Sequence, residues 1–133
     1  MCFVFADLQF TQWLLGVGNV DNAVFSLRYV QNSGAAFSIL QNSREFLIIL
    51  ACAALTLIFR HVYYHPLQFK EMFFTAMLCA GIAGNMHERI VYGFVRDYFK
   101  LNFIDFPVFN ISDVFITVGV AALIILILIR KTK

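Results

Sequence analysis

Two acidic residues lie beside apolar segments of this chain, where an ionisable side chain is expensive to keep. Asp113 stands at the start of the last apolar segment, in FNISDVFITVG, and Asp97 follows the third, in GFVRDYF. Because lipid solvates charge poorly, such residues are candidate functional groups. If the spans alternate in direction, the end of the third and the start of the fourth share one face of the membrane. We therefore expect these two carboxylates to approach each other, near three further polar residues, Asn85, Arg89 and Asn110.

A pair of carboxylates in a site of low dielectric constant supports hydrolytic chemistry. Both members cannot ionise easily, so their titrations separate. The ionised member can take a proton from water, while the protonated member can polarise a peptide carbonyl and later protonate the leaving amine. The two titrate jointly, so the sequence does not assign acid and base individually. The chemistry indicated is peptide hydrolysis by an activated water, without a metal, a cofactor or a covalent intermediate.

Structural roles for the same two residues remain open at this point. Asp113 could cap the last helix, because acidic residues are favourable near a helix N-terminus. Asp97 could be a charge at the membrane interface that pairs with Arg96 or Lys100. Ion pairs and helix caps also place carboxylates at the ends of spans.

The composition indicates the elements that must position these residues. Of the 133 residues, 61% are apolar and 14% are charged, and the mean hydropathy is +0.78. A soluble domain of this size could not bury so much apolar surface. We expect an all-α membrane protein that forms a single domain over residues 1–133, with four transmembrane helices at roughly 1–16, 45–64, 68–88 and 109–130. The formal charge of +2 gives no support for a nucleic-acid partner.

The connections between the spans have their own patterns. Residues 22–43 contain β-favouring side chains followed by the turn signal Asn32-Ser33-Gly34, which predicts a small sheet at one membrane face. Residues 89–106 are aromatic and mixed in charge, which fits a short interfacial helix or a strand. Counting Lys and Arg on the two sides of four alternating spans gives five against five. The basic C-terminal cluster at 130–133 then favours termini on the inner side.

Four short motifs, in order along the chain, resemble those of the signal peptidase II family, also called lipoprotein signal peptidase. Residues 32–38 (NSGAAFS) match N-x-G-A-A-F-S, and residues 84–89 (GNMHER) match G-N-x-x-D-R except at Glu88. Residues 93–98 (GFVRDY) resemble G-x-V-x-D-F, and residues 109–113 (FNISD) resemble F-N-x-A-D. Each motif alone is weak, but four in the same order with preserved spacing form a specific signal.

The resemblance implies an intramembrane aspartyl endopeptidase of the bacterial cytoplasmic (inner) membrane with its site towards the outer face. Its substrates would be diacylglyceryl-modified prolipoproteins, cleaved before the lipidated cysteine. By position, the catalytic residues fall on Asp97 and Asp113, and four supporting or substrate-binding residues fall on Asn32, Asn85, Arg89 and Asn110. It also implies a small extracytoplasmic sheet and a short interfacial helix over the site. We further expect contacts with membrane lipids and a monomer. Arg89 would hold a substrate or lipid carbonyl, brace Asp113, or contact a lipid phosphate.

The chain also departs from the family pattern. Glu88 replaces an aspartate, which lengthens by one methylene what we expect to be a local ion pair or cap. The family's D-Q-x-T-K near the end of the first span appears as LQFTQ at residues 8–12, without its charged members, although Asp7 stands one residue early. These changes leave open a divergent relative, one with altered specificity, or an inactive one.

Other candidate chemistry has less support. His61 and His65 have the spacing of two metal ligands on one helix, but no third ligand lies nearby in the sequence, so we expect no metal site. Two rival functions remain: a non-catalytic membrane protein that binds lipidated peptides, and a small ion- or proton-conducting subunit. Uncharged middles of the second and fourth spans count against conduction, and retention of both aspartates counts against binding alone.

Overall fold

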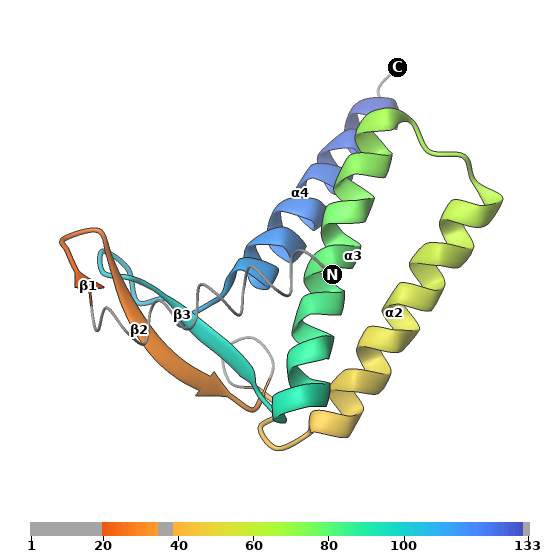
Figure 1. Ribbon diagram of the computed structural model, residues 1–133. Coiled ribbons are helices and arrows are strands. Elements are labelled where there is room, and N and C mark those ends of the chain that lie inside the picture. Colours follow the sequence, from red (N-terminus) through yellow and green to blue (C-terminus); the bar gives the residue numbers. More distant parts are fainter. Residues whose placement is uncertain (1–19, 35–38, 132–133) are drawn as a thin grey trace.

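The computed structural model describes residues 20–34 and 39–131 of the chain, which form three long helices and a small sheet (Figure 1). Helix α3 lies between α2 and α4, and the sheet extends from the end of the bundle where α4 begins. In chain order the elements are β1 (Val20–Asp21), β2 (Phe25–Asn32), α2 (Arg44–Tyr64), α3 (Phe69–Tyr92), β3 (Val95–Leu101) and α4 (Ile111–Lys131).

The helix ends follow local sequence signals. Helix α2 stops at Tyr64 because the next residue, His65, is extended (φ −132°, ψ 105°), as expected for a residue that precedes a proline. Helix α3 begins with a capping box between Gln68 and Glu71. It ends at Tyr92, because the next residue, Gly93, has a φ of 85°, the left-handed conformation that favours glycine.

Two described helices, α2 and residues 111–130 of α4, are long and apolar enough to cross a membrane. Helix α3 has 24 residues, enough for about 36 Å, but carries more polar side chains. Large apolar side chains on α2 and α4 point away from the protein; Ile49 is 66% exposed and Leu128 is 60% exposed. Such surfaces suit contact with lipid. The fold is therefore mainly helical, as predicted, while the predicted first span at 1–16 lies outside the described residues.

Helices α3 and α4 approach closely at two glycines. A Cβ atom on Gly81 would lie 2.5 Å from the Ser112 carbonyl oxygen, and one on Gly119 would lie 3.1 Å from the Phe74 carbonyl oxygen. A residue with a side chain at either position would push the backbones of α3 and α4 apart. The two glycines therefore permit close contact between the helices, and this contact fixes the start of α4 against α3.

The sheet joins segments that are far apart in the sequence. Its order is β1-β2-β3 with antiparallel pairing throughout, and in the β2–β3 ladder Val30 is paired with Asp97 and Asn32 with Val95. Leu27 and the fully buried Tyr98 form the small core of this part. The predicted turn follows β2, where the Asn32 Oδ1 accepts a hydrogen bond from the Gly34 N–H at 2.9 Å.

One alternative for the connection after α3 is wrong. Residues 89–106 contain the end of α3 and strand β3, and the short interfacial helix expected there does not form. The first four residues of β3 are buried and pair with β2, so backbone hydrogen bonding to a neighbouring strand replaces the local bonds of a helix. The other alternative, a strand, is confirmed.

Candidate active site

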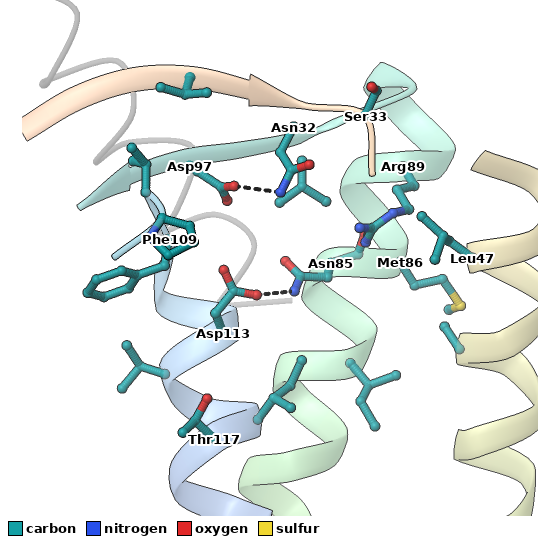
Figure 2. A pocket seen from close by; sticks show the side chains of 18 of the residues that line it. Asn32, Ser33, Leu47, Asn85, Met86, Arg89, Asp97, Phe109, Asp113 and Thr117 are labelled. Carbon is teal, nitrogen blue, oxygen red and sulfur yellow. Dashed lines mark hydrogen bonds between the residues drawn. The ribbon is translucent and has the colours of Figure 1, made fainter. Parts of the chain in front are cut away.

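A cavity of about 760 Å³ lies where the sheet meets the three helices, with its lining drawn in Figure 2. Its polar end is lined by side chains from β2, α3, β3 and α4. The remainder is mostly apolar and lies between α2, α3 and α4. The polar residues at this end include Asn32, Asn85, Arg89, Asp97 and Asp113.

Asp97 reaches the cavity from β3 and is 2% exposed. Each of its carboxylate oxygens accepts a hydrogen bond from a side-chain amide: Oδ2 from the Asn32 Nδ2 at 2.9 Å, and Oδ1 from the Asn110 Nδ2 at 2.8 Å. Neighbouring side chains in a strand point to opposite faces, so Asp97 and Arg96 are directed apart. This geometry argues against the alternative that Asp97 is a surface charge paired with Arg96.

Asp113 lies in the first turn of α4 and forms a capping box with Asn110. The Asp113 Oδ2 accepts the backbone N–H of Asn110 at 3.1 Å, and the Asn110 Oδ1 accepts the backbone N–H of Asp113 at 2.9 Å. Its other oxygen, Oδ1, accepts the Asn85 Nδ2 at 2.8 Å. Asp113 is thus a helix cap, as the structural alternative held, and it also lines the cavity. The two roles are compatible, because the cap fixes the direction of the side chain.

Asn110 connects the two carboxylates. It is 4% exposed, and its side chain donates to Asp97 while its backbone N–H donates to Asp113. The same amide also donates to the Asn85 Oδ1 at 3.1 Å, which extends the network to α3. Figure 2 shows Asp97 and Asp113 lining the same space, with Asp97 bonded to Asn32 and Asp113 bonded to Asn85. The structure therefore brings Asp97 and Asp113 to one cavity together with Asn32 and Asn85, and Asn110 bonds to both carboxylates.

The environment of Asp97 raises its pKa from 3.8 to about 7. Burial is the main cause because it disfavours the charged form, and the nearby Asp113 acts in the same direction. Hydrogen bonds from Asn32 and Asn110 and the charge of Arg89 lower the pKa and offset part of the rise. Near neutral pH the cavity thus contains a carboxyl group that can exchange a proton.

Arg89 also lines the cavity, but its hydrogen bonds go to main-chain carbonyls. The Nη2 donates to the Gly34 oxygen at 2.6 Å and the Nη1 to the Asn85 oxygen at 3.1 Å. Its Nε is buried without a hydrogen-bond partner among the described residues. One function of Arg89 is therefore to attach the turn after β2 to α3.

Two features of the site were missed from the sequence. Glu88 forms a buried ion pair, as expected, but its partner is Arg96 on β3. The apolar part of the cavity includes small residues of α2, Ala51 and Ala54, which are three positions apart. That spacing could have predicted a cavity wall on α2, because it places two small side chains on one face of a helix.

The two histidines of α2 and its C-cap lie together at the opposite end of the helix from the cavity. The rings of His61 and His65 stack with centroids 4.7 Å apart. Within residues 20–34 and 39–131, no group of three or more His, Cys, Asp or Glu side chains is arranged to bind a metal ion.

Comparisons with known proteins agree on one family. A family model described as signal peptidase (SPase) II matches residues 1–129. The lipoprotein signal peptidase of Streptococcus thermophilus (strain CNRZ 1066) is 40% identical over 105 residues, covering 78% of this chain and 69% of the relative. That of Lactococcus lactis subsp. lactis (strain IL1403) is 34% identical over 134 residues, covering 96% and 89%.

A solved structure has the same fold. It is described as a bacterial membrane enzyme determined by the in meso method at 2.3 Å resolution, with a TM-score of 0.84 and 28% identity over 98% of this chain and 84% of the other. The resemblance drawn from the four motifs is confirmed. The chain belongs to the signal peptidase II family of membrane proteases, which process lipoproteins.

Proposed function

We propose that this chain is an intramembrane aspartyl endopeptidase that cleaves the signal peptides of lipid-modified bacterial prolipoproteins just before the lipidated cysteine. The observation that carries the proposal is the link from Asp97 through Asn110 to Asp113 at one cavity. Two proteins named lipoprotein signal peptidase are 40% and 34% identical to this chain over 78% and 96% of its length, which supports the substrate class.

In the proposed mechanism the two aspartates share one proton near neutral pH, because burial and mutual repulsion oppose ionisation of both. The ionised carboxylate takes a proton from water while the water oxygen attacks the scissile carbonyl. The protonated carboxyl gives its proton to the carbonyl oxygen, which forms a tetrahedral diol. On collapse, the first carboxyl protonates the leaving nitrogen and the second recovers its proton from a hydroxyl. The products are an acid and an amine, and the pair again holds one proton.

The amides around the pair have a distinct part in this mechanism. Asn32 and Asn110 bind the two oxygens of Asp97, and Asn85 binds one oxygen of Asp113. Donors fixed in advance stabilise charge that develops during reaction, since they need no reorganisation at that moment. They also fix which oxygen of each carboxylate is directed towards the substrate. Arg89 supports the site indirectly by binding the Gly34 carbonyl.

The apolar part of the cavity suits the lipid of the substrate. Leu47, Leu50 and Ala54 line it from α2, while Ile82 and Ile116 line it from α3 and α4. Burial of acyl chains there would contribute about 0.8 kcal/mol per methylene, so a lipidated peptide binds far better than its unmodified form. We infer that this surface selects for the diacylglyceryl group.

We further propose that the cavity opens towards the outer face of the bacterial inner membrane. The α2–α3 connection and the end of α4 lie together at the end of the bundle away from the cavity (Figure 1), with Arg60, Lys70 and Arg130 at or near this end. Arg96, at the cavity end, is neutralised in a buried ion pair. With Arg96 set aside, four basic residues remain on the cavity side (Arg28, Arg44, Arg89 and Lys100) against five on the other side (Arg60, Lys70, Arg130, Lys131 and Lys133), which favours a cytoplasmic position for the end opposite the cavity.

The test is cleavage of a purified diacylglyceryl-modified prolipoprotein by the purified protein in detergent. Wild type is expected to release the signal peptide, and Asp97→Asn and Asp113→Asn are each expected to abolish turnover while the protein stays folded. EDTA is expected to leave activity unchanged. Near-normal turnover by either variant would refute the mechanism, and wild type that binds the precursor without cleaving it would indicate a binding protein instead.

A further inference from the structure

A buried ion pair connects α3 to β3 beside the proposed catalytic residues. Glu88 is 6% exposed and Arg96 is 8% exposed. The Glu88 Oε2 accepts the backbone N–H of Arg96 at 2.8 Å, and its Oε1 accepts the Arg96 Nε at 2.9 Å and also contacts Nη2. One carboxylate thus binds both the main chain and the side chain of the same arginine. We call this arrangement the Glu88–Arg96 clamp.

The Glu88–Arg96 clamp joins the two sides of the short turn between α3 and β3. Helix α3 ends at Tyr92, Gly93 takes a left-handed conformation with its N–H bound to the Arg89 carbonyl at 3.1 Å, and β3 begins at Val95. The Arg96 guanidinium lies over the Tyr92 ring, 4.6 Å from its centroid. The direction in which β3 leaves α3 is therefore fixed at the glycine and again at Arg96.

Asp97 is the next residue of the strand. Because successive side chains alternate, a strand anchored to α3 through Arg96 directs the Asp97 carboxylate to the opposite face, where it meets Asn32 and Asn110. Any rotation or shift of β3 at Arg96 moves Asp97 as well. We propose that Glu88 and Arg96 are positioning residues that fix the depth and direction of the Asp97 side chain, an inference that rests on the peptidase function proposed above.

Stability alone does not account for a clamp of this kind. A buried ion pair is often no more stabilising than apolar residues of the same volume, although removal of one partner is strongly destabilising. A charged carboxylate that accepts several N–H groups of one residue does provide precise geometry. Precision matters at this position, since a displacement of about 1 Å at a reacting group can lower the rate about 10²-fold.

The clamp is tested by Glu88→Gln and Arg96→Gln in the prolipoprotein cleavage assay. The glutamine at 88 keeps the shape, but its NH2 group faces N–H donors. We expect kcat to fall about 10²-fold while KM changes less than about twofold. This decrease in kcat should be larger than any decrease in the fraction of folded protein. The double variant is expected to be no worse than the worse single variant, because both remove one unit. The matched control is Arg28→Gln on β2, which breaks the exposed pair with Asp21 at 3.8 Å and should leave kcat unchanged.

The pH profile separates positioning from general stability. Asp97 is faced by Asn32 of β2, Asn110 before α4, Asp113 of α4 and Arg89 of α3. If β3 shifts so that Asp97 becomes less buried, its pKa falls, and the alkaline limb of kcat moves to lower pH in the Gln variants.

Glu88→Asp keeps the charge but shortens the side chain by one methylene. It is expected to retain more activity than Glu88→Gln, and this comparison carries the test if Arg96→Gln does not fold. Folded Glu88→Gln with wild-type kcat and pH profile would overturn the clamp. Asp97→Asn is measured in parallel: if it is inactive while Glu88→Gln is normal, the clamp alone fails, and if it is active, the proposed mechanism fails.

Discussion

Asn110 is the residue whose replacement most directly tests the proton-sharing pair. Its side chain has two separable functions: the Oδ1 caps α4 through the Asp113 N–H, and the Nδ2 donates to Asp97. Serine is also a good N-cap residue, but it is too short to replace the amide donor. Asn110→Ser therefore keeps the helix cap and removes the link to Asp97, whereas Asn110→Ala removes both.

The size of the effect follows from burial. Asp97 is 2% exposed, so an oxygen that loses its donor there is left without a partner, at a cost of about 1–3 kcal/mol. If this loss falls on the transition state, kcat decreases about 10- to 100-fold, since about 1.4 kcal/mol corresponds to a factor of ten. Asn110→Ala is expected to lose about 1 kcal/mol of further stability through the missing cap.

The direction in which the pH profile of kcat shifts in Asn110→Ser also follows from the structure. The hydrogen bond from Asn110 lowers the pKa of Asp97. Its loss raises the pKa of Asp97 further, so Asp97 loses its proton at higher pH and the alkaline limb of kcat moves to higher pH. The assay is kcat against pH with the lipidated precursor, and thermal unfolding in detergent measures the cap. Asn110→Ser with wild-type kcat and an unmoved alkaline limb would refute the reasoning.

Three further predictions concern packing, substrate binding and proton linkage. Gly119→Leu forces a side chain between α3 and α4 and is expected to lower the free energy of unfolding by about 1–3 kcal/mol, whereas Val120→Leu on the exposed face is expected to be neutral in detergent melting. Ala54→Trp fills the apolar part of the cavity and is expected to raise KM for the lipidated precursor; Ala53→Trp, which points outward, is the control, and equal KM values would contradict the lipid site. Because the pKa of Asp97 is about 7 in the folded protein against 3.8 ordinarily, the folded state retains a proton that the unfolded chain releases, and wild-type stability falls as pH rises from about 4 to 7. The stability of Asp97→Asn relative to wild type should then rise by on the order of 4 kcal/mol across this window, measured by unfolding at several pH values, and a constant difference would mean that Asp97 titrates normally.

The helices and the place of the site were predictable because their causes are local. Apolar runs mark α2 and α4, and Pro66 ends α2 in the expected place. The approach of Asp97 and Asp113 followed from one further assumption, that consecutive spans alternate in direction. The end of α3, which is followed by β3 with Asp97, then lies at the same end of the bundle as the start of α4 with Asp113.

The sheet and its consequences depend on contacts that single segments do not encode. Asn32 and Asp97 are 65 positions apart, and only the pairing of β2 with β3 places the amide beside the carboxylate. The same pairing converts the expected interfacial helix into a strand. It also decides that Arg96 faces Glu88 while Asp97 faces the cavity, a choice that one step in register would reverse.

The position of the pair at a helix end has a physical reason. In lipid, the interior N–H groups of a helix are all bonded within the helix, so they cannot stabilise a carboxylate. The first turn is the exception, because its N–H groups have no partner in the helix. Asp113 and Asn110 form reciprocal hydrogen bonds in that turn, and the Asn110 side-chain amide donates a further hydrogen bond to Asp97. The start of α4 and the aspartate pair are therefore one hydrogen-bonded structure, so a substitution that moves the start of the helix also separates the two carboxylates.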